Sequence, residues 1–162
     1  MIEPLEDPET PVVLLSIKPR YAQRILSGMK KFELRTWIGL NLYSGMLVVM
    51  YASGNVKAIV GEFRVGKVYK GRPEFVWGRL IEEGGEEKTG VGEEDYLYIA
   101  RAKKAMALEV LEPKVYKRPP KLEEIRMIIP GWLPPMSHTL LGTGDPLWEM
   151  VIKPVREVSE IP

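Results

Sequence analysis

The chain has 162 residues, 45% of them hydrophobic, which is enough for one domain with a sizeable core. It has no cysteine and a single histidine, His138, so disulfides, thiolate zinc sites and clusters of imidazole ligands within one chain are excluded. No apolar run reaches 18 residues and the first residues do not form a secretory signal, so we expect a cytoplasmic protein without a membrane span.

Charge is distributed unevenly, although the net charge is only +1. Residues 10–81 carry 12 Lys and Arg against 3 Glu, whereas residues 82–95 carry 7 acidic residues against one Lys. A basic body beside an acidic segment suits an anionic partner such as a nucleic acid, and interspersed surface charge is the alternative. The scarcity of Asn and Gln, with abundant Glu, Lys and Arg, resembles the composition of thermophile proteins.

The first predicted elements are an arm, a strand and a short helix. We expect residues 1–11 to form a flexible N-terminal arm. Val12–Ile17 is a continuous apolar run, which is typical of a strand buried on both faces. Pro19 suits the first turn of a helix, and Gly28 stands where a helix C-terminal glycine belongs.

A second strand is predicted over Lys31–Trp37. Side chains alternate between the two faces of a strand. Phe32 and Leu34 should therefore face one way, and Glu33 and Arg35 the other. This segment thus predicts one apolar and one charged face.

The later elements are short and separated by glycine- and proline-containing turns. Residues 38–44 predict a loop, the acidic Gly-rich residues 82–92 an exposed loop, and residues 130–136 a proline-stiffened loop. Further elements are predicted as strands at Met46–Tyr51, Ala58–Val68, Lys104–Tyr116 (continuous or broken at Pro113) and Leu147–Ile152, and as helices at 92–100 and Leu122–Ile128. Five or six strands with two or three short helices favour an α+β fold, a small mixed β-barrel, over a doubly wound sheet.

The spacing G-x-K-x-x-E-x-R stands out, formed by Gly28, Lys30, Glu33 and Arg35. With the segments LSIKP and YAQRILSG before it, and MYASG, AIVGEF and PPMSHTLL after it, the chain resembles the ASCH domain family. That family is similar to the PUA domain and shares its small β-barrel. The resemblance predicts an ASCH-type, PUA-like domain over residues 12–154, followed by a C-terminal tail at 155–162.

The resemblance also implies a function. It places Lys30, Glu33 and Arg35 in a cleft between the barrel and the first helix. Most members of the family are described as RNA binders or coactivator modules, so we expect this chain to bind RNA or a nucleotide-like ligand. A protein-interaction module in gene regulation is an alternative.

Hydrolysis is a different class of function that the resemblance allows. Some small relatives hydrolyse the acyl group of acylated cytidine with the signature lysine, a threonine at the position of Glu33 and a glutamate from a later helix. This chain carries Glu33 instead, and a carboxylate cannot supply the chemistry of a hydroxyl. If the chain were such an amidohydrolase, Lys30 and Glu33 would be its catalytic candidates, and ribonuclease activity is a second hydrolytic possibility.

The signature residues have chemistry suited to a polar ligand. Arg35 offers a planar donor fork for phosphate or carboxylate, although a surface pair with Glu33 is its alternative role. Glu33 could orient Arg35, accept a hydrogen bond from a base or act as a general base. Lys30 could contact phosphate, activate a nucleophile or remain a solvated turn residue.

Other candidates lie outside the signature. Lys18 and Arg20 oppose the dipole at a predicted helix start, which suggests contacts to an anionic ligand. Tyr51 and Ser53 end a central strand, where Tyr51 could stack on a base or belong to the core. Ser137 approaches the cleft by resemblance, and Trp132, in a proline-rich loop, is a candidate stacking surface. We expect no metal and no cofactor, and the oligomeric state is left open.

Overall fold

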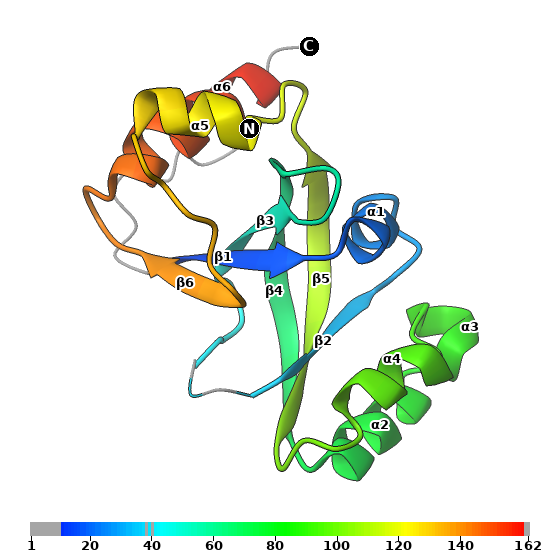
Figure 1. Cartoon of the computed structure of the whole chain (residues 1–162). Helices are drawn as coiled ribbons and strands as arrows, with labels where there is room; N and C mark the ends of the chain where they lie inside the picture. The colour runs from blue at the N-terminus through cyan, green and yellow to red at the C-terminus, as the bar shows by residue number, and fades with distance from the viewer. Residues whose placement is uncertain (1–10, 38, 40, 161–162) are drawn as a thin grey trace. The chain divides into compact units, whose positions relative to one another are not determined.

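The computed structural model describes residues 11–37, 39 and 41–160 (Figure 1). Residues 1–10 of the arm predicted at 1–11 therefore lie outside the described residues, as do positions 38 and 40 of the loop predicted at 38–44. Contacts between Cα atoms divide the chain into two units. Unit 1 comprises the residues up to Ala22, Met46–Glu62 and those from Lys114 onward, and unit 2 comprises Gln23–Gly45 and Phe63–Pro113.

A six-stranded mixed sheet runs through the fold, in the order β2-β5-β4-β3-β1-β6. The two longest strands, β4 and β5, contribute residues to both units. The strands are β1 (Val12–Ile17), β2 (Phe32–Thr36), β3 (Leu47–Ala52), β4 (Ala58–Gly71), β5 (Ala105–Val115) and β6 (His138–Leu141). The predicted α+β class, with five or six strands in a mixed sheet, is confirmed.

Unit 1 is built around β1, which pairs in parallel with β3 and antiparallel with β6. The apolar run of β1 is buried on both faces, as its sequence predicts. One face of this sheet carries Leu14, Val49 and Tyr51, which pack against buried Trp148 and Ile152. This core holds the carboxyl ends of β1 and β3 in place.

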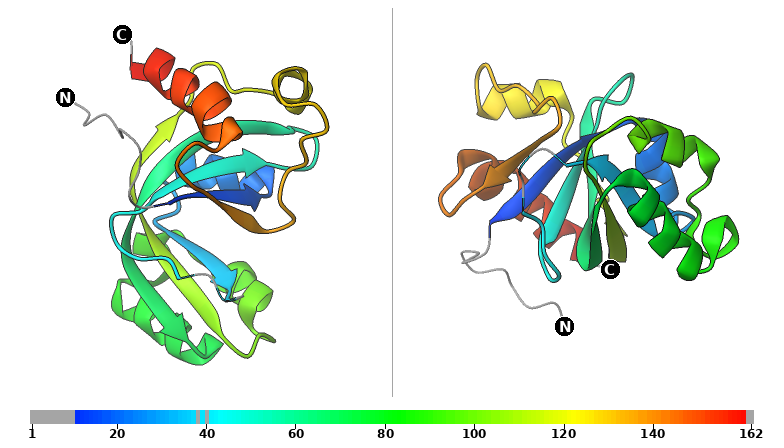
Figure 2. Two further views of the ribbon diagram at one scale, coloured as in Figure 1. Left: turned by 90° about the vertical axis from the view of Figure 1, so that its left-hand side faces the viewer. Right: turned by 90° about the horizontal axis from the view of Figure 1, so that it is seen from below.

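The C-terminal part of unit 1 is helical. It contains α5 (Leu122–Ile128), the π-helix η1 (Trp148–Ile152) and α6 (Lys153–Glu160), and η1 contacts both helices (Figure 2). The strand predicted at Leu147–Ile152 is wrong: Trp148, Val151 and Ile152 are buried at helical spacing, which a short apolar run cannot reveal. Residues 155–160 of the predicted tail continue α6.

Unit 2 contains the helices α2 (Pro73–Glu82), α3 (Gly85–Thr89) and α4 (Glu93–Ile99). Val76, Leu80 and Ile99 pack on apolar residues of β2 and β5. The exposed loop predicted at 82–92 is wrong: it contains the last residue of α2 and all of α3, and Val91 is buried.

Counting α1 (Pro19–Leu26), the described residues contain six α-helices, more than the two or three predicted. Short helices with two glycines between them carry too little periodicity to be recognised in the sequence. Within the described part of the chain, every helix falls short of the length and apolar character needed to cross a membrane.

Gly90 closes α3 at a point where only glycine fits. Its φ is +72°, and an added Cβ would lie 1.9 Å from the carbonyl oxygen of Met29. The neighbouring Thr89 carbonyl accepts a hydrogen bond from the Lys31 N–H at 2.7 Å, so this close approach joins α3 to the segment that enters β2. The chain therefore depends on Gly90 to deliver Lys30 to its buried position.

We expect Gly90→Ala to lower the free energy of unfolding by more than about 2 kcal/mol, because it adds a backbone clash to a left-handed conformation. Gly78→Ala is the matched control: Gly78 lies inside α2 with open space at its Cβ position, and alanine should stabilise that helix by about 0.5–1 kcal/mol. Urea denaturation measures both. Equal stability of the two variants would contradict the close approach.

Candidate functional site

The charged residues of the signature spacing converge within unit 2. The Lys30 Nζ lies 3.2 Å from the Glu33 Oε1, and the Arg35 Nη1 lies 3.7 Å from the Glu33 Oε2. All three residues are buried, with only 2%, 3% and 8% of their surfaces exposed. Strand β2 is therefore covered on both faces, the charged face included, which the alternation of its sequence did not predict.

Asp95, at the start of α4, completes this group. Its Oδ1 lies 3.1 Å from the Lys30 Nζ, and its Oδ2 accepts a hydrogen bond from the Gly92 N–H at 3.0 Å. Sequence reasoning placed Asp95 in a first helical turn but missed it as a partner of Lys30. The G-x-x-D spacing of a helix cap is the signal that could have singled it out. We call Lys30, Glu33, Arg35 and Asp95 the charged cluster.

The charged cluster holds Lys30 as a cation. Burial by itself would lower the pKa of Lys30, but the nearby carboxylates of Glu33 and Asp95 more than offset this, and its pKa is raised. At neutral pH the ammonium group therefore stays protonated. A lysine in this state can neutralise buried carboxylates, but it is a poor base for activating a nucleophile.

A second group of polar side chains gathers in unit 1, where the parallel strands β1 and β3 end. Ser16 is the register partner of Tyr51, so these two side chains continue the face that carries Leu14 and Val49. The Ser16 hydroxyl donates to the Pro135 carbonyl, and the Ser16 N–H donates to the Ser137 carbonyl at 2.9 Å. These contacts bring the loop before β6 to the ends of β1 and β3.

Ser53 belongs to the same group. Its N–H and its hydroxyl both donate to the Ile17 carbonyl, at 2.9 and 3.2 Å. Next to Ser137, the Nδ1 of His138 lies 3.3 Å from the Ser137 Oγ. We call Ser16, Tyr51, Ser53 and Ser137 the strand-end cluster. His138 is the register partner of Leu15, so its side chain leaves the other face of the sheet.

Lys18 and Arg20 flank Pro19 where β1 passes into α1, and both are exposed. The Lys18 carbonyl accepts hydrogen bonds from the N–H groups of Tyr21 and Ala22, which starts the helix. Gly54, one residue beyond Ser53, lies against the Pro19 ring, with 3.6 Å between its Cβ position and the Pro19 Cδ. The start of α1 therefore adjoins the strand-end cluster.

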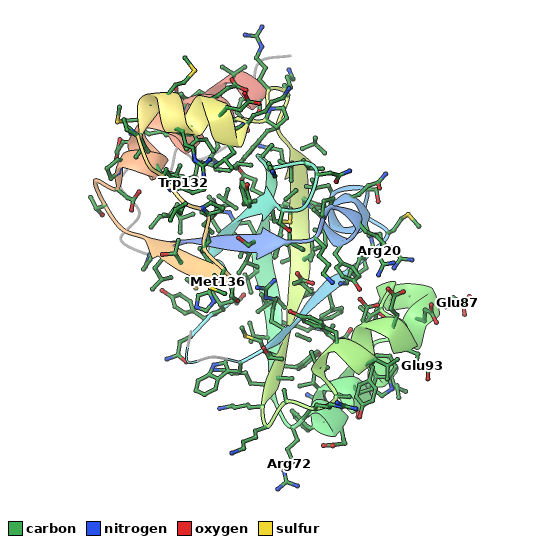
Figure 3. All side chains as sticks on the ribbon, in the orientation of Figure 1. Arg20, Arg72, Glu87, Glu93, Trp132 and Met136 are labelled. Atoms are coloured by element: carbon green, nitrogen blue, oxygen red, sulfur yellow. The ribbon has the colours of Figure 1, made fainter. Side chains whose placement is uncertain are left out.

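Arg20 projects from the start of α1 (Figure 3), where its guanidinium lies 4.9 Å from the Tyr21 ring centroid and donates to the Tyr21 hydroxyl at 3.0 Å. This stacking orients a side chain that remains exposed. The predicted cations Lys18 and Arg20 are therefore exposed near the ends of β1 and β3.

Tyr51 is the buried member of the strand-end cluster, 2% exposed, and its ring makes an edge contact with Trp132 at 5.9 Å. Burial raises the pKa of Tyr51, and the charge of Arg126 partly offsets that rise. The Tyr51 hydroxyl therefore stays protonated at neutral pH and can donate a hydrogen bond. Tyr51 is therefore a core residue at the end of a strand, and its stacking on a base stays a prediction.

Arg126, on α5, is a residue that sequence reasoning missed. Its Nε donates to the Trp132 carbonyl at 3.1 Å, and its guanidinium is close enough to Tyr51 to affect its pKa. Arg126 lies in no sequence pattern that would have pointed to it.

The predicted site residues therefore fall into two clusters. Lys30, Glu33 and Arg35 belong to the charged cluster of unit 2, whereas the remaining candidates belong to unit 1. Those remaining candidates are Lys18, Arg20, Tyr51, Ser53 and Ser137. In the described part of the chain, no three His, Asp or Glu side chains are grouped so that they could hold a metal ion.

Comparison with known proteins identifies the family to which the chain is similar. A model of the ASCH domain matches residues 15–112. A relative from Zymomonas mobilis subsp. mobilis, named ASCH domain-containing ribonuclease, is 28% identical over 135 residues, which cover 83% of this chain and 86% of the relative.

Solved structures of the ASCH protein of Zymomonas mobilis have a similar fold. One, of a variant with a tyrosine replaced by phenylalanine, has a TM-score of 0.70 at 24% identity and covers 86% of this chain and 96% of its own. Another has a TM-score of 0.68 at 24% identity, covering 91% and 94%. These likenesses establish the fold.

For the charged cluster, we expect Lys30→Met to lower the free energy of unfolding by about 3–5 kcal/mol, because two buried carboxylates would lose their shared cation. Lys31→Met is the control, since Lys31 is adjacent but exposed, and it should change stability by less than about 0.5 kcal/mol. Chemical denaturation at pH 7 compares them. Similar effects of both substitutions would show that Lys30 is not the cation that holds the cluster.

Proposed function

Because this chain belongs to the ASCH domain family, we propose that it binds RNA, and that the strand-end cluster and its neighbouring cations make the contact. The relative named a ribonuclease supports RNA as the class of ligand. The proposal rests on one observation: the strand-end cluster gathers several hydroxyl groups where β1 and β3 end. The exposed cations Lys18 and Arg20 follow β1 at the same place.

This combination of groups suits a phosphate backbone. Hydroxyl groups of Ser and Tyr, together with Lys and Arg, make most protein contacts to phosphate and sugar oxygens. Lys18 and Arg20 are exposed, so their charges are accessible to a polyanion. Tyr51 is buried beneath these groups, where its ring supports the loop through the edge contact with Trp132.

We propose a supporting role for the charged cluster. Its Lys30 and Glu33 side chains are at most 4% exposed and satisfy one another, while the Arg35 side chain is 10% exposed. A buried cation between two carboxylates positions strand β2 and helix α4, whereas a polyanion needs accessible charge. That Lys30, Glu33 or Arg35 touches a ligand stays a prediction.

The same geometry argues against an amidohydrolase. In that reading Lys30 would activate the attacking group and Glu33 would act as base. Lys30 has a raised pKa and is paired with Glu33 and Asp95, which keeps it protonated. Turnover of an N-acylated cytidine that disappears in Lys30→Ala would overturn this argument.

RNA binding is tested by fluorescence anisotropy with a short labelled single-stranded RNA over a range of salt concentrations. We expect Lys18→Ala with Arg20→Ala to weaken binding about tenfold or more, and to make the slope of log K against log salt less negative by about 1.4. The reason is that each lost phosphate contact on a single strand removes about 0.7 from that slope.

The control removes the same charge elsewhere: Lys88→Ala with Lys103→Ala, both exposed in unit 2. This variant should keep the affinity and the salt slope of the wild type. Equal losses in the two double variants would point to nonspecific attraction and contradict a contact at the strand-end cluster.

Cleavage of the bound RNA is a second candidate function, favoured by the name of the relative and by His138, whose Nδ1 lies beside the Ser137 hydroxyl. His138 would accept the proton of a ribose 2′-hydroxyl as its oxygen attacks phosphorus. The P–O5′ bond would break as the leaving oxygen takes a proton from water.

We expect His138→Ala to slow cleavage of a labelled RNA by about 100-fold or more while the affinity for RNA changes little. An otherwise identical oligonucleotide with 2′-deoxyribose at the cleaved position should remain intact, because it lacks the attacking hydroxyl. Cleavage of the deoxy substrate, or full activity of His138→Ala, would eliminate this mechanism.

A further inference from the structure

Unit 1 contains an open groove with a volume of about 350 Å³, bordered by the loop before β6 and the loop between β6 and η1. Its walls are mainly apolar, with one carboxylate. The residues that matter here are Trp132, Leu133, Pro135, Asp145, Pro146 and Leu147. A volume of this size is at the lower end of the range for small-ligand pockets.

The groove shares two residues with the surroundings of the strand-end cluster. Trp132 lines the groove and makes the edge contact with Tyr51, and the Pro135 carbonyl accepts the Ser16 hydroxyl. Trp132 lies on the segment that joins α5 to β6 (Figure 3). A ligand held at the strand-end cluster therefore has an aromatic, apolar recess directly beside it.

Asp145 supplies polar recognition in this recess. Its Oδ1 accepts a hydrogen bond from the Leu147 N–H at 2.9 Å, and no other donor in the described part of the chain bonds to this carboxylate. The residue is half-buried and lines the groove, so its second oxygen can accept a hydrogen bond from an N–H group of a ligand that displaces water.

We propose that this groove binds an unpaired nucleobase with an exocyclic amino group (cytosine, adenine or guanine) of the RNA whose backbone contacts the strand-end cluster. The inference rests on the proposed RNA binding. Trp132 and the prolines provide the apolar and aromatic surface that single-stranded bases use, and Asp145 accepts the amino hydrogen. Uracil fits less well, because its two carbonyl oxygens would approach the carboxylate on either side of its single N–H.

The test uses a short labelled RNA whose central nucleotide is cytidine, adenosine, uridine or an abasic ribose. We expect the cytidine and adenosine forms to bind about tenfold more tightly than the uridine and abasic forms. Asp145→Asn keeps an oxygen for the Leu147 N–H but places an amide donor where the carboxylate oxygen stood. This variant should lose most of its preference for cytidine and bind the uridine form more tightly than the wild type does.

Glu149→Gln is the matched control, because it removes the same charge from η1 at a residue that does not line the groove. It should keep the base preference. Equal binding of all four oligonucleotides by the wild type would overturn the nucleobase site and leave RNA binding standing. Failure of all four to bind would overturn both, and an unchanged preference in Asp145→Asn would overturn the assignment of Asp145.

Discussion

The parallel pairing of β1 with β3 is the constraint on which the strand-end cluster depends. Parallel strands end at the same edge, so the residues that follow Ile17 and Ala52 emerge side by side. The register also places Ser16 next to Tyr51, and β6, on the other side of β1, brings Ser137 within hydrogen-bonding distance of Ser16. Three segments far apart in the sequence therefore supply one set of polar groups.

The charged side chains fall into two groups. Buried, paired charges hold elements of the fold together, whereas exposed cations are available to a ligand. In unit 2, Lys30 is buried and paired with two carboxylates, and in unit 1 the buried Glu62 is paired with Arg156 and accepts the Tyr116 hydroxyl. Separating such a pair would leave a buried charge without a partner and lower the stability of the fold, so each pair keeps the elements that carry it together. Lys18 and Arg20 remain exposed beside hydroxyl groups, the arrangement that suits an anionic ligand.

The sequence was informative wherever one physical signal dominated. The apolar run of β1, the helix start at Pro19 and the helix at Leu122–Ile128 lie where they were predicted. It misled where short apolar or glycine-rich stretches allow two periodicities, as at Trp148–Ile152 and in α3. Strand β6 has four residues, of which only Leu141 is buried, so it offers no alternation to recognise.

By itself, the sequence determined the α+β class, the family through the spacing of Gly28, Lys30, Glu33 and Arg35, and the residue types available for chemistry. Only the tertiary structure decided which of these residues share surroundings. It paired Lys30 with Asp95 from a helix distant in the sequence, and it set Asp145 and Trp132 along one groove. The physical reason is that burial and long-range pairing depend on how β-strands register and how helices pack, and neither is encoded in local spacing.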